Sequence, residues 1–216
     1  MLVDVIIPSK TSDQMAPILM QCISSLKSSE PTIKFNAVVV ESGEHRALGQ
    51  DRTIAYDQDI FCYNHALNLG INSTQNEWVI LANNDLIFHP YFMSEILNAH
   101  AFHPDIQSFS PWNNMDGWHD SAMSNYPYAD LYVGYDTSYR LAGWCIIVRR
   151  EVLNRIDLNE RCRLWYSDNI YSDELQRYGI QHALIRQSRV DHLCTQTIDF
   201  SRYDTGEDYA RYMREK

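Results

Sequence analysis

Apolar residues along the first hundred positions alternate between short continuous runs and helical spacing. The runs at 3–7, 34–40 and 78–81 are rich in Val and Ile, and each gives way to proline or polar residues, as buried strands do. Residues 12–29, 63–73 and 90–101 are expected to be helices, and Pro90 suits a helix start. Because alternating strands and helices are typical of a parallel sheet with crossover helices, the pattern predicts an α/β fold.

The pattern is less regular in the second half of the chain. Residues 110–140 are dense in Trp, Tyr, Asn and Gly, which predicts loops with room for one hairpin. Further on we expect strands at 141–148 and 181–190, helices at 150–156 and 168–178, and one helix in the polar tail. No internal repeat or linker interrupts the chain. The sequence therefore predicts a single domain over residues 1–216, with parts at about 1–105, 106–193 and 194–216.

Composition and charge narrow the class of protein. Hydrophobic residues make up 45% and charged residues 21% of the 216 residues, as in an ordinary globular domain. A net charge of -10 disfavours anionic membranes and nucleic acid, whose phosphates require clustered Lys and Arg, so we expect no nucleic-acid partner. No apolar run approaches the roughly 20 residues that span a bilayer, so we expect no integral membrane segment.

The N-terminal residues and the cysteines indicate a cytoplasmic protein. Residues 1–8 lack a basic stretch followed by a long apolar one, so we expect no signal peptide. The five cysteines are scattered and form no C-x-x-C pair. This pattern is typical of reduced thiols that serve as small buried side chains.

Polar side chains follow three of the expected strands. They are Pro8-Ser9-Lys10, Glu41-Ser42 and Asn83-Asn84-Asp85. In open α/β sheets, ligands bind just beyond the carboxyl ends of the strands. The three strand ends therefore predict a binding pocket at one edge of the sheet.

These strand ends resemble a known family. Residues 3–9 (VDVIIPS), 38–43 (VVVESG) and 76–85 (NEWVILANND) resemble the strand-end motifs of GT-A glycosyltransferases, above all glycosyltransferase family 2 and its rhamnosyltransferase-like members. Four further segments are similar to family motifs: 63–71 (YNHALNLGI), 141–150 (LAGWCIIVRR), 165–168 (WYSD) and 189–192 (RVDH). The resemblance covers residues 2–193 in the family's order.

The resemblance implies a fold and a function. The expected fold is a single-domain GT-A architecture, with a Rossmann-like nucleotide-binding half, a mostly parallel central sheet flanked by helices, and an irregular acceptor-side half. The implied activity is metal-dependent, inverting transfer of a sugar, expected to be a hexosyl group, from a nucleotide diphosphate sugar, with UDP-sugars favoured. The acceptor would be a hydroxyl of a glycan, a lipid-linked molecule or a protein, and the cofactor Mn²⁺ or Mg²⁺.

Two residues are candidate metal ligands. A hard divalent cation stabilises the charge that develops on diphosphate oxygens, and Asp85 supplies a carboxylate at a strand end. By resemblance, Asp85 and His192 bind the ion and Asn83, with Asn84 beside it, contacts the nucleotide. Asp85 also suits a helix cap before Pro90, and a lone strand-end histidine is often structural. His100 and His103 form an H-x-x-H pair without an evident third ligand, which disfavours zinc.

Asp168 is the candidate general base. Inverting transfer requires a carboxylate that takes the proton of the acceptor hydroxyl. The acid follows Trp165 and Tyr166, which could desolvate it and raise its pKa. An N-cap role suits the position as well, and Asp173 and Glu174 are competitors further along the same helix.

The remaining candidates concern the nucleoside and the acceptor. By resemblance, Pro8, Ser9 and Glu41 line the nucleoside. Lys10 either touches the base or is solvated, and Asn64 and Asn68 either contact the nucleotide or form a polar helix face. Sugars stack on aromatic rings, so an aromatic group in the second half is the candidate acceptor site; its members are residues 112–118, Tyr126, Tyr128, Tyr132 and Tyr135. The alternative is that these rings cover the core.

Three alternatives remain beside this interpretation. A nucleotidyltransferase would carry a glycine-rich loop after the first strand, and residues 8–12 have no glycine. A catalytically inactive GT-A domain that binds a nucleotide sugar or a glycan would fit two departures from the family pattern: Glu41 replaces the commoner aspartate, and Asn83 replaces the first acid of an acid-x-acid motif. A retaining transferase would lack a dedicated base, so Asp168 discriminates between the two mechanisms.

Overall fold

The structure is a computed structural model that describes residues 1–58, 60–113, 115, 119, 129–137, 139–193 and 204–214. Its strands are β1 (Leu2–Ser9), β2 (Lys34–Glu41), β3 (Arg52–Ala55), β4 (Trp78–Ala82), β5 (Leu86–Phe88), β6 (Ile106–Trp112), β7 (Leu131–Val133), β8 (Cys145–Arg149) and β9 (Gln181–His192). Its helices are α1 (Ala16–Ser28), α2 (Tyr63–Asn72), α3 (Phe92–Phe102), α5 (Arg150–Leu153), α6 (Ser167–Arg177) and α7 (Thr205–Met213).

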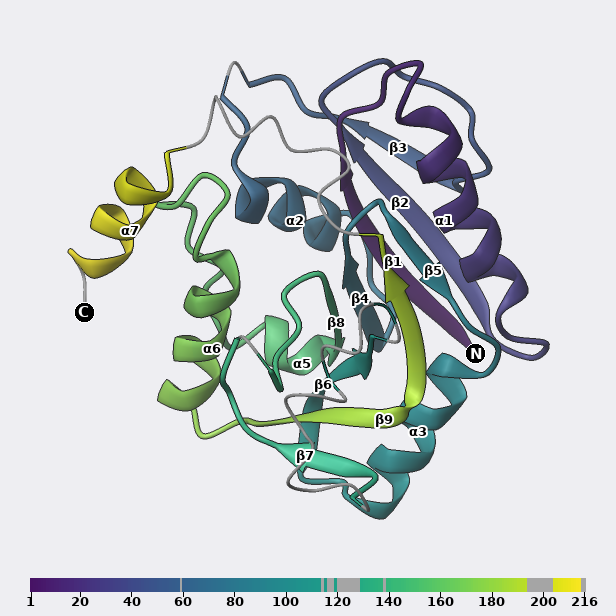
Figure 1. The fold of residues 1–216 in the computed structure, drawn as a ribbon, viewed down its shortest axis with the longest axis vertical. Helices are drawn as coiled ribbons and strands as arrows, with labels where there is room; N and C mark the ends of the chain where they lie inside the picture. Colours follow the sequence, from purple (N-terminus) through teal and green to yellow (C-terminus); the bar gives the residue numbers. More distant parts are fainter. Residues whose placement is uncertain are drawn as a thin grey trace.

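The described strands form one mixed sheet in the order β3-β2-β1-β4-β8-β6-β9-β5, and β7 also pairs with β9 (Figure 1). Strands β3, β2, β1 and β4 are mutually parallel, as is the β6–β9 pair. Strand β8 runs antiparallel between β4 and β6, and β5 and β7 run antiparallel to β9. This confirms the predicted α/β class with a mostly parallel central sheet flanked by helices.

The first half follows the predicted elements closely. Strands β1, β2 and β4 and helices α1, α2 and α3 each overlap the expected segment within a few residues. The register of β1 on β2 runs from Leu2 opposite Lys34 to Ser9 opposite Glu41. The polar strand ends at residues 9, 41 and 83 therefore lie on one edge of the sheet, as predicted.

Four strands were not predicted from the sequence. β3, β5 and β7 have only three or four residues, too few to show a period. β6 lies partly in the segment expected to be loop, because Ser108 and Ser110 interrupt its apolar pattern although both are fully buried. The Ser108 hydroxyl lies 2.7 Å from Tyr171 Oη and 2.8 Å from His182 Nδ1, and Ser110 Oγ accepts a hydrogen bond from Ala142 N. Hydrogen bonds to residues distant in the sequence therefore offset the cost of burying these hydroxyls.

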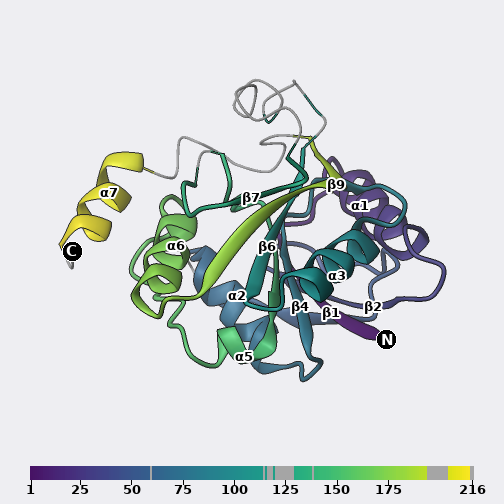
Figure 2. The ribbon, with the colours of Figure 1, turned by 90° about the horizontal axis from the view of Figure 1, so that it is seen from below.

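Two apolar layers enclose the sheet. Alternate residues of β1 face opposite sides, so that Val5 and Ile7 pack in the layer of α1 and α3 whereas Ile6 packs in the layer of α2 and α6 (Figure 2). Gly70 of α2 lies so close to the sheet that a Cβ there would come within 2.2 Å of Ile6 Cγ2. The helix can therefore reach the sheet only because this position lacks a side chain.

The burial of the cysteines agrees with the sequence analysis where the structure describes them. Cys22, Cys62, Cys145 and Cys162 are buried free thiols, and Cys194 lies outside the described residues. Within the described chain, no helix combines the length and the apolar character that a membrane crossing requires.

Candidate active site

Four of the predicted site residues line one pocket of about 280 Å³. Asn83 and Asp85 come from the end of β4, His192 from the end of β9, and Asp168 from the first turn of α6. The other walls are formed by Tyr63 of α2, by residues 143–144 before β8, by Thr137, and by residues 164–167 before and at the start of α6. The pocket therefore opens at the carboxyl end of the parallel strands, where the fold was expected to bind its ligand.

Asp85 and His192 form a pair in this pocket that fits a divalent cation. Asp85 is 2% exposed, and its buried Oδ1 has no hydrogen-bond partner among the described residues. His192 Nε2 lies 3.4 Å from that oxygen. Two neighbouring ligands that each lie about 2.1 Å from one cation are separated by about 3.0–3.5 Å, depending on the coordination geometry. The spacing and the unsatisfied carboxylate oxygen therefore suit a shared ion.

Strand β5 explains why these two residues meet. It follows Asp85 directly and pairs antiparallel with β9, which places Leu86 opposite His192. Leu193 N also donates a hydrogen bond to the Asp85 carbonyl oxygen at 3.0 Å. The pair depends on a three-residue strand that sequence periodicity did not reveal.

Neighbouring side chains orient the imidazole and the Asn83 amide. The ring of Trp144 stacks on His192, with ring centroids 5.3 Å apart and an interplanar angle of 18°. Tyr63 Oη donates to Asn83 Oδ1 at 2.8 Å, which leaves Asn83 Nδ2 3.4 Å from His192 Nε2. Burial raises the pKa of Tyr63 well above its usual value, so the hydroxyl stays a donor. Asn83 consequently presents an N–H donor, rather than its oxygen, towards the imidazole.

Asp168 is half-buried in the pocket wall and has a raised pKa. Burial disfavours its charged form, and this effect outweighs the Asn169 N–H that donates to its Oδ1 at 2.9 Å. Gly143 makes room for the side chain, because a Cβ there would lie 2.6 Å from Asp168 Cβ and 2.8 Å from Oδ2. The N-cap residue of α6 is Tyr166, so Asp168 is not the cap.

The two competing acids of α6 lie outside the residues that line the pocket. Asp173 Oδ2 accepts a hydrogen bond from Tyr212 Oη at 2.7 Å. Glu174 accepts one from Asp157 N and pairs with Arg177. Of the three acids proposed as the base, the pocket therefore contains only Asp168.

The predicted nucleoside residues after β1 and β2 bind one another. Glu41 is 3% exposed, and its carboxylate accepts hydrogen bonds from Thr11 N, Thr11 Oγ1 and Gly43 N at 2.7, 2.5 and 2.6 Å. Asn84 Nδ2 donates to Ser9 Oγ at 3.3 Å. Pro8 is buried in β1, and Lys10 is exposed. These residues lie at the predicted edge but do not line the 280 Å³ pocket, and their nucleoside contacts stay a prediction.

The α2 amides bind a loop rather than facing this pocket. Asn64 Nδ2 donates to Asn159 O at 2.8 Å, and Asn68 Nδ2 donates to Leu158 O at 3.0 Å and to Glu160 Oε1 at 2.8 Å. Asn64 is 1% exposed. The amides thus hold the segment at 158–160 against α2, and a role in nucleotide binding stays a prediction.

The remaining candidates are placed as follows. Trp112 is fully buried beside Tyr132, and Tyr135 Oη donates to Ile180 O. Tyr126, Tyr128 and most of residues 113–118 lie outside the described residues. His100 Nδ1 lies 2.9 Å from Ile106 O, and no group of three or more potential metal ligands occurs in the described part of the chain. Among the described residues, Asp85 and His192 are therefore a pair of possible ligands and not part of a larger group.

Sequence reasoning did not single out Tyr63, Gly143 or Trp144 as pocket residues. Tyr63 and Trp144 lie within segments that resemble family motifs, which was the available signal. Their contacts with Asn83 and His192 join positions far apart in the sequence. Only the folded chain shows them.

Comparison with known proteins supports the fold. No family model matches the chain, and no curated protein matches it. Among solved structures, it is similar to residues 1–349 of TarS from S. aureus, a wall teichoic acid glycosyltransferase, with a TM-score of 0.64 and 13% sequence identity. The match covers 88% of this chain and 59% of the TarS chain. The fold is GT-A-like. An identity this low shows the fold alone, and the chain spans less than two thirds of the TarS chain that it matches.

Proposed function

We propose that this chain is a metal-dependent glycosyltransferase that uses a nucleotide diphosphate sugar. The observation that carries the proposal is the buried Asp85 Oδ1, which has no hydrogen-bond partner among the described residues and lies 3.4 Å from His192 Nε2 in the pocket that also contains Asp168. A buried carboxylate oxygen without a partner is costly, so a cation is the simplest explanation of the arrangement. The GT-A-like fold supports the same conclusion.

Asp85 and His192 are the proposed protein ligands of Mn²⁺ or Mg²⁺. A pair of ligands suits these ions, because Mg²⁺ in particular is bound by one or two carboxylates together with substrate phosphates and water. When bound, the ion supplies positive charge that stabilises the departing diphosphate. Trp144 stacks on the imidazole and orients it, and the Tyr63 hydroxyl fixes the amide of Asn83. An ion bound at His192 Nε2 would take the lone pair that faces Asn83 Nδ2 and so would replace that contact.

Asp168 is the proposed general base of an inverting reaction. It takes the proton of the acceptor hydroxyl, while that oxygen bonds to the anomeric carbon. The bond from this carbon to the phosphate oxygen breaks, and its electron pair leaves with the nucleoside diphosphate. The half-buried position raises the pKa of Asp168, and a carboxylate with a raised pKa is the stronger base.

The finer parts of the proposal rest on the sequence resemblance. They are membership of family 2 near its rhamnosyltransferase-like members, a UDP-hexose donor, and a glycan, lipid-linked or protein acceptor. The nucleoside would bind at the edge formed by Pro8, Ser9, Lys10 and Glu41. A cytoplasmic location is proposed from the cysteine pattern.

One observation favours a second candidate, an inactive GT-A domain that binds a nucleotide sugar or a glycan. The Glu41 carboxylate is occupied by Thr11 and Gly43, and Asn83 Oδ1 is occupied by Tyr63. A nucleotide could therefore bind the Glu41 carboxylate or Asn83 Oδ1 only if these hydrogen bonds rearranged. Such a module would bind its ligand but not cleave it.

The test measures nucleotide release from a panel of nucleotide sugars, with and without Mn²⁺, for the natural chain and for three variants. Asp85→Ala should abolish the metal-dependent release. Asp168→Asn should lower turnover by roughly 10²–10⁴-fold while nucleotide binding persists, as for loss of a general base. Glu174→Gln, which removes an α6 carboxylate outside the pocket, is the matched control and should retain activity.

Binding of a donor without any turnover across a panel of acceptors would support the inactive module and reject the transferase. Turnover that Asp85→Ala leaves intact would reject the assigned metal site. Equal loss in Asp168→Asn and Glu174→Gln would reject the assignment of the base.

A further inference from the structure

The C-terminal helix α7 contacts the loop that forms one wall of the pocket. Its Asp208 is 1% exposed. One carboxylate oxygen, Oδ1, accepts a hydrogen bond from Arg163 N, and the other accepts bonds from Leu164 N and Trp165 N, each at 3.0 Å. Successive backbone N–H groups form a concave site for an anion, and hydrogen bonds to a charged acceptor are stronger than neutral ones. Helix α7 therefore supplies the anion that this loop binds.

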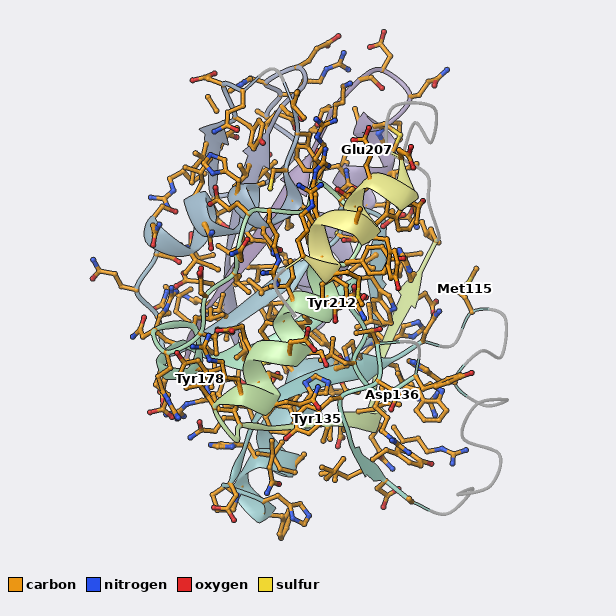
Figure 3. The ribbon with its side chains drawn as sticks, turned by 90° about the vertical axis from the view of Figure 1, so that its left-hand side faces the viewer. Met115, Tyr135, Asp136, Tyr178, Glu207 and Tyr212 are labelled. Carbon is orange, nitrogen blue, oxygen red and sulfur yellow. The ribbon has the colours of Figure 1, made fainter. Side chains whose placement is uncertain are left out.

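A second contact fixes the residue that follows this loop. Tyr166 has φ of 66°, a left-handed conformation that residues other than glycine adopt uncommonly. Its ring stacks on Tyr212 of α7, with centroids 5.3 Å apart and an interplanar angle of 11°. The Tyr212 hydroxyl donates to Asp173 of α6 at 2.7 Å. Figure 3 shows Tyr212 where α7 meets α6. Helix α7 thus holds both the unusual turn and the helix that the turn begins.

The segment that α7 holds leads directly to the candidate base. Residues 164–168 line the pocket, and Ser167 and Asp168 form the first turn of α6. On its other side, the segment is bound by α2, because Tyr63 N donates to Arg163 O at 2.7 Å. A shift of the 163–166 loop would consequently move the start of α6 relative to Tyr63 and the metal ligands.

We propose that Asp208 is a positioning residue for Asp168. Docking of α7 on residues 163–166 sets the place of the first turn of α6, and with it the distance from the Asp168 carboxylate to the rest of the pocket. Asp208 itself does not line the pocket. The inference rests on the proposed role of Asp168 as base. It adds α7, which lies beyond the residues that the family resemblance covers, to the parts of the chain that shape the catalytic site.

The test compares Asp208→Asn with Glu207→Gln in the full chain. Glu207 is the matched control, because it is adjacent and exposed, carries the same charge and pairs with the same Arg211. Hydrogen exchange of the Leu164 and Trp165 amides should accelerate roughly ten- to a hundredfold in Asp208→Asn, as expected for loss of charge-assisted hydrogen bonds. Glu207→Gln should leave it unchanged.

Kinetics and the carboxyl ¹³C resonance of Asp168 report on positioning itself. In Asp208→Asn we expect kcat to fall roughly tenfold while the KM for the donor changes less than about twofold, because Asp85 and His192 are untouched. The Asp168 resonance should move in this variant and not in the control. Tyr212→Phe keeps the ring stack and removes the bond to Asp173, so it is a milder second variant. Its amide exchange, its kcat and its Asp168 resonance should change in the same direction as in Asp208→Asn.

The outcomes separate this inference from the proposed function. Unchanged exchange at Leu164 and Trp165 in Asp208→Asn would overturn the docking role. Faster exchange together with an unchanged kcat and an unmoved Asp168 resonance would show that α7 stabilises the loop without positioning Asp168, and would overturn the proposal. A natural chain without turnover would refute the transferase, and the Asp168 resonance would then still show whether Asp208 sets the position of that carboxyl group.

Discussion

His182 lies fully buried in β9, and its burial lowers its pKa to about 3. The neutral ring makes two hydrogen-bond contacts, with Ser108 Oγ at its Nδ1 and with Arg140 O at its Nε2. The unfolded chain, with an ordinary histidine pKa of about 6.5, takes up a proton here well before the folded chain does. Acidification below pH 6.5 should therefore favour unfolding, and the effect should level off near the folded pKa.

The size of this effect follows from linkage. Between the two pKa values, each pH unit of acidification removes about 1.4 kcal/mol of the free energy of unfolding. From pH 8 to pH 5, the loss attributable to His182 is about 2 kcal/mol, a value that holds for any folded pKa well below 5. For a chain of this length, that corresponds to a melting temperature lower by about 4–8 °C.

The assay is urea unfolding at pH 8 and pH 5 for the natural chain and for His182→Gln. Glutamine offers a donor and an acceptor of similar reach but does not titrate, so it removes the pH-dependent contribution while it retains a polar group beside Ser108. The natural chain should lose about 2 kcal/mol more than the variant between the two pH values. Equal losses would refute the assignment of a neutral, buried His182.

Three further predictions concern the pocket and the far end of the sheet. Gly143→Ala should displace Asp168, because the new Cβ would overlap its side chain, and should lower turnover roughly 10²-fold in donor kinetics. Gly134→Ala is the control and should not, because the three atoms nearest to its new Cβ all belong to the flexible Arg140 side chain. The rate of transfer by the natural chain should rise with pH through a pKa above the ordinary aspartate value, as the raised pKa of Asp168 requires, and a pH–rate profile without such a limb would contradict this. Asp4→Ala should lower the free energy of unfolding in urea by about 3–5 kcal/mol, because it removes the fully buried carboxylate that pairs with Arg150 at 3.0 Å. A loss below about 1 kcal/mol would contradict this.

The sequence predicted the parts of the fold in which burial and periodicity coincide. Strands β1, β2 and β4 are apolar runs buried on both faces, and α1 carries its apolar residues on one face, so local pattern alone indicates them. β6 escaped prediction because its buried serines look like surface residues until Tyr171, His182 and Ala142 are brought to them. Pattern reasoning fails where a polar side chain is satisfied by a residue distant in the sequence.

For the candidate site, the sequence by itself determined which residue types stand at the strand ends, and it named Asn83, Asp85, Asp168 and His192. Only the tertiary structure decided that these four share a pocket whereas Glu41, Asn64 and Asn68 are occupied by neighbouring loops. The three-residue strand β5 brings Asp85 to His192, and the far C-terminal Asp208 holds the loop that precedes Asp168. Residue identity sets what chemistry a position can supply. The long-range pairing of strands and helices sets which positions meet, and that pairing is not encoded in any local pattern.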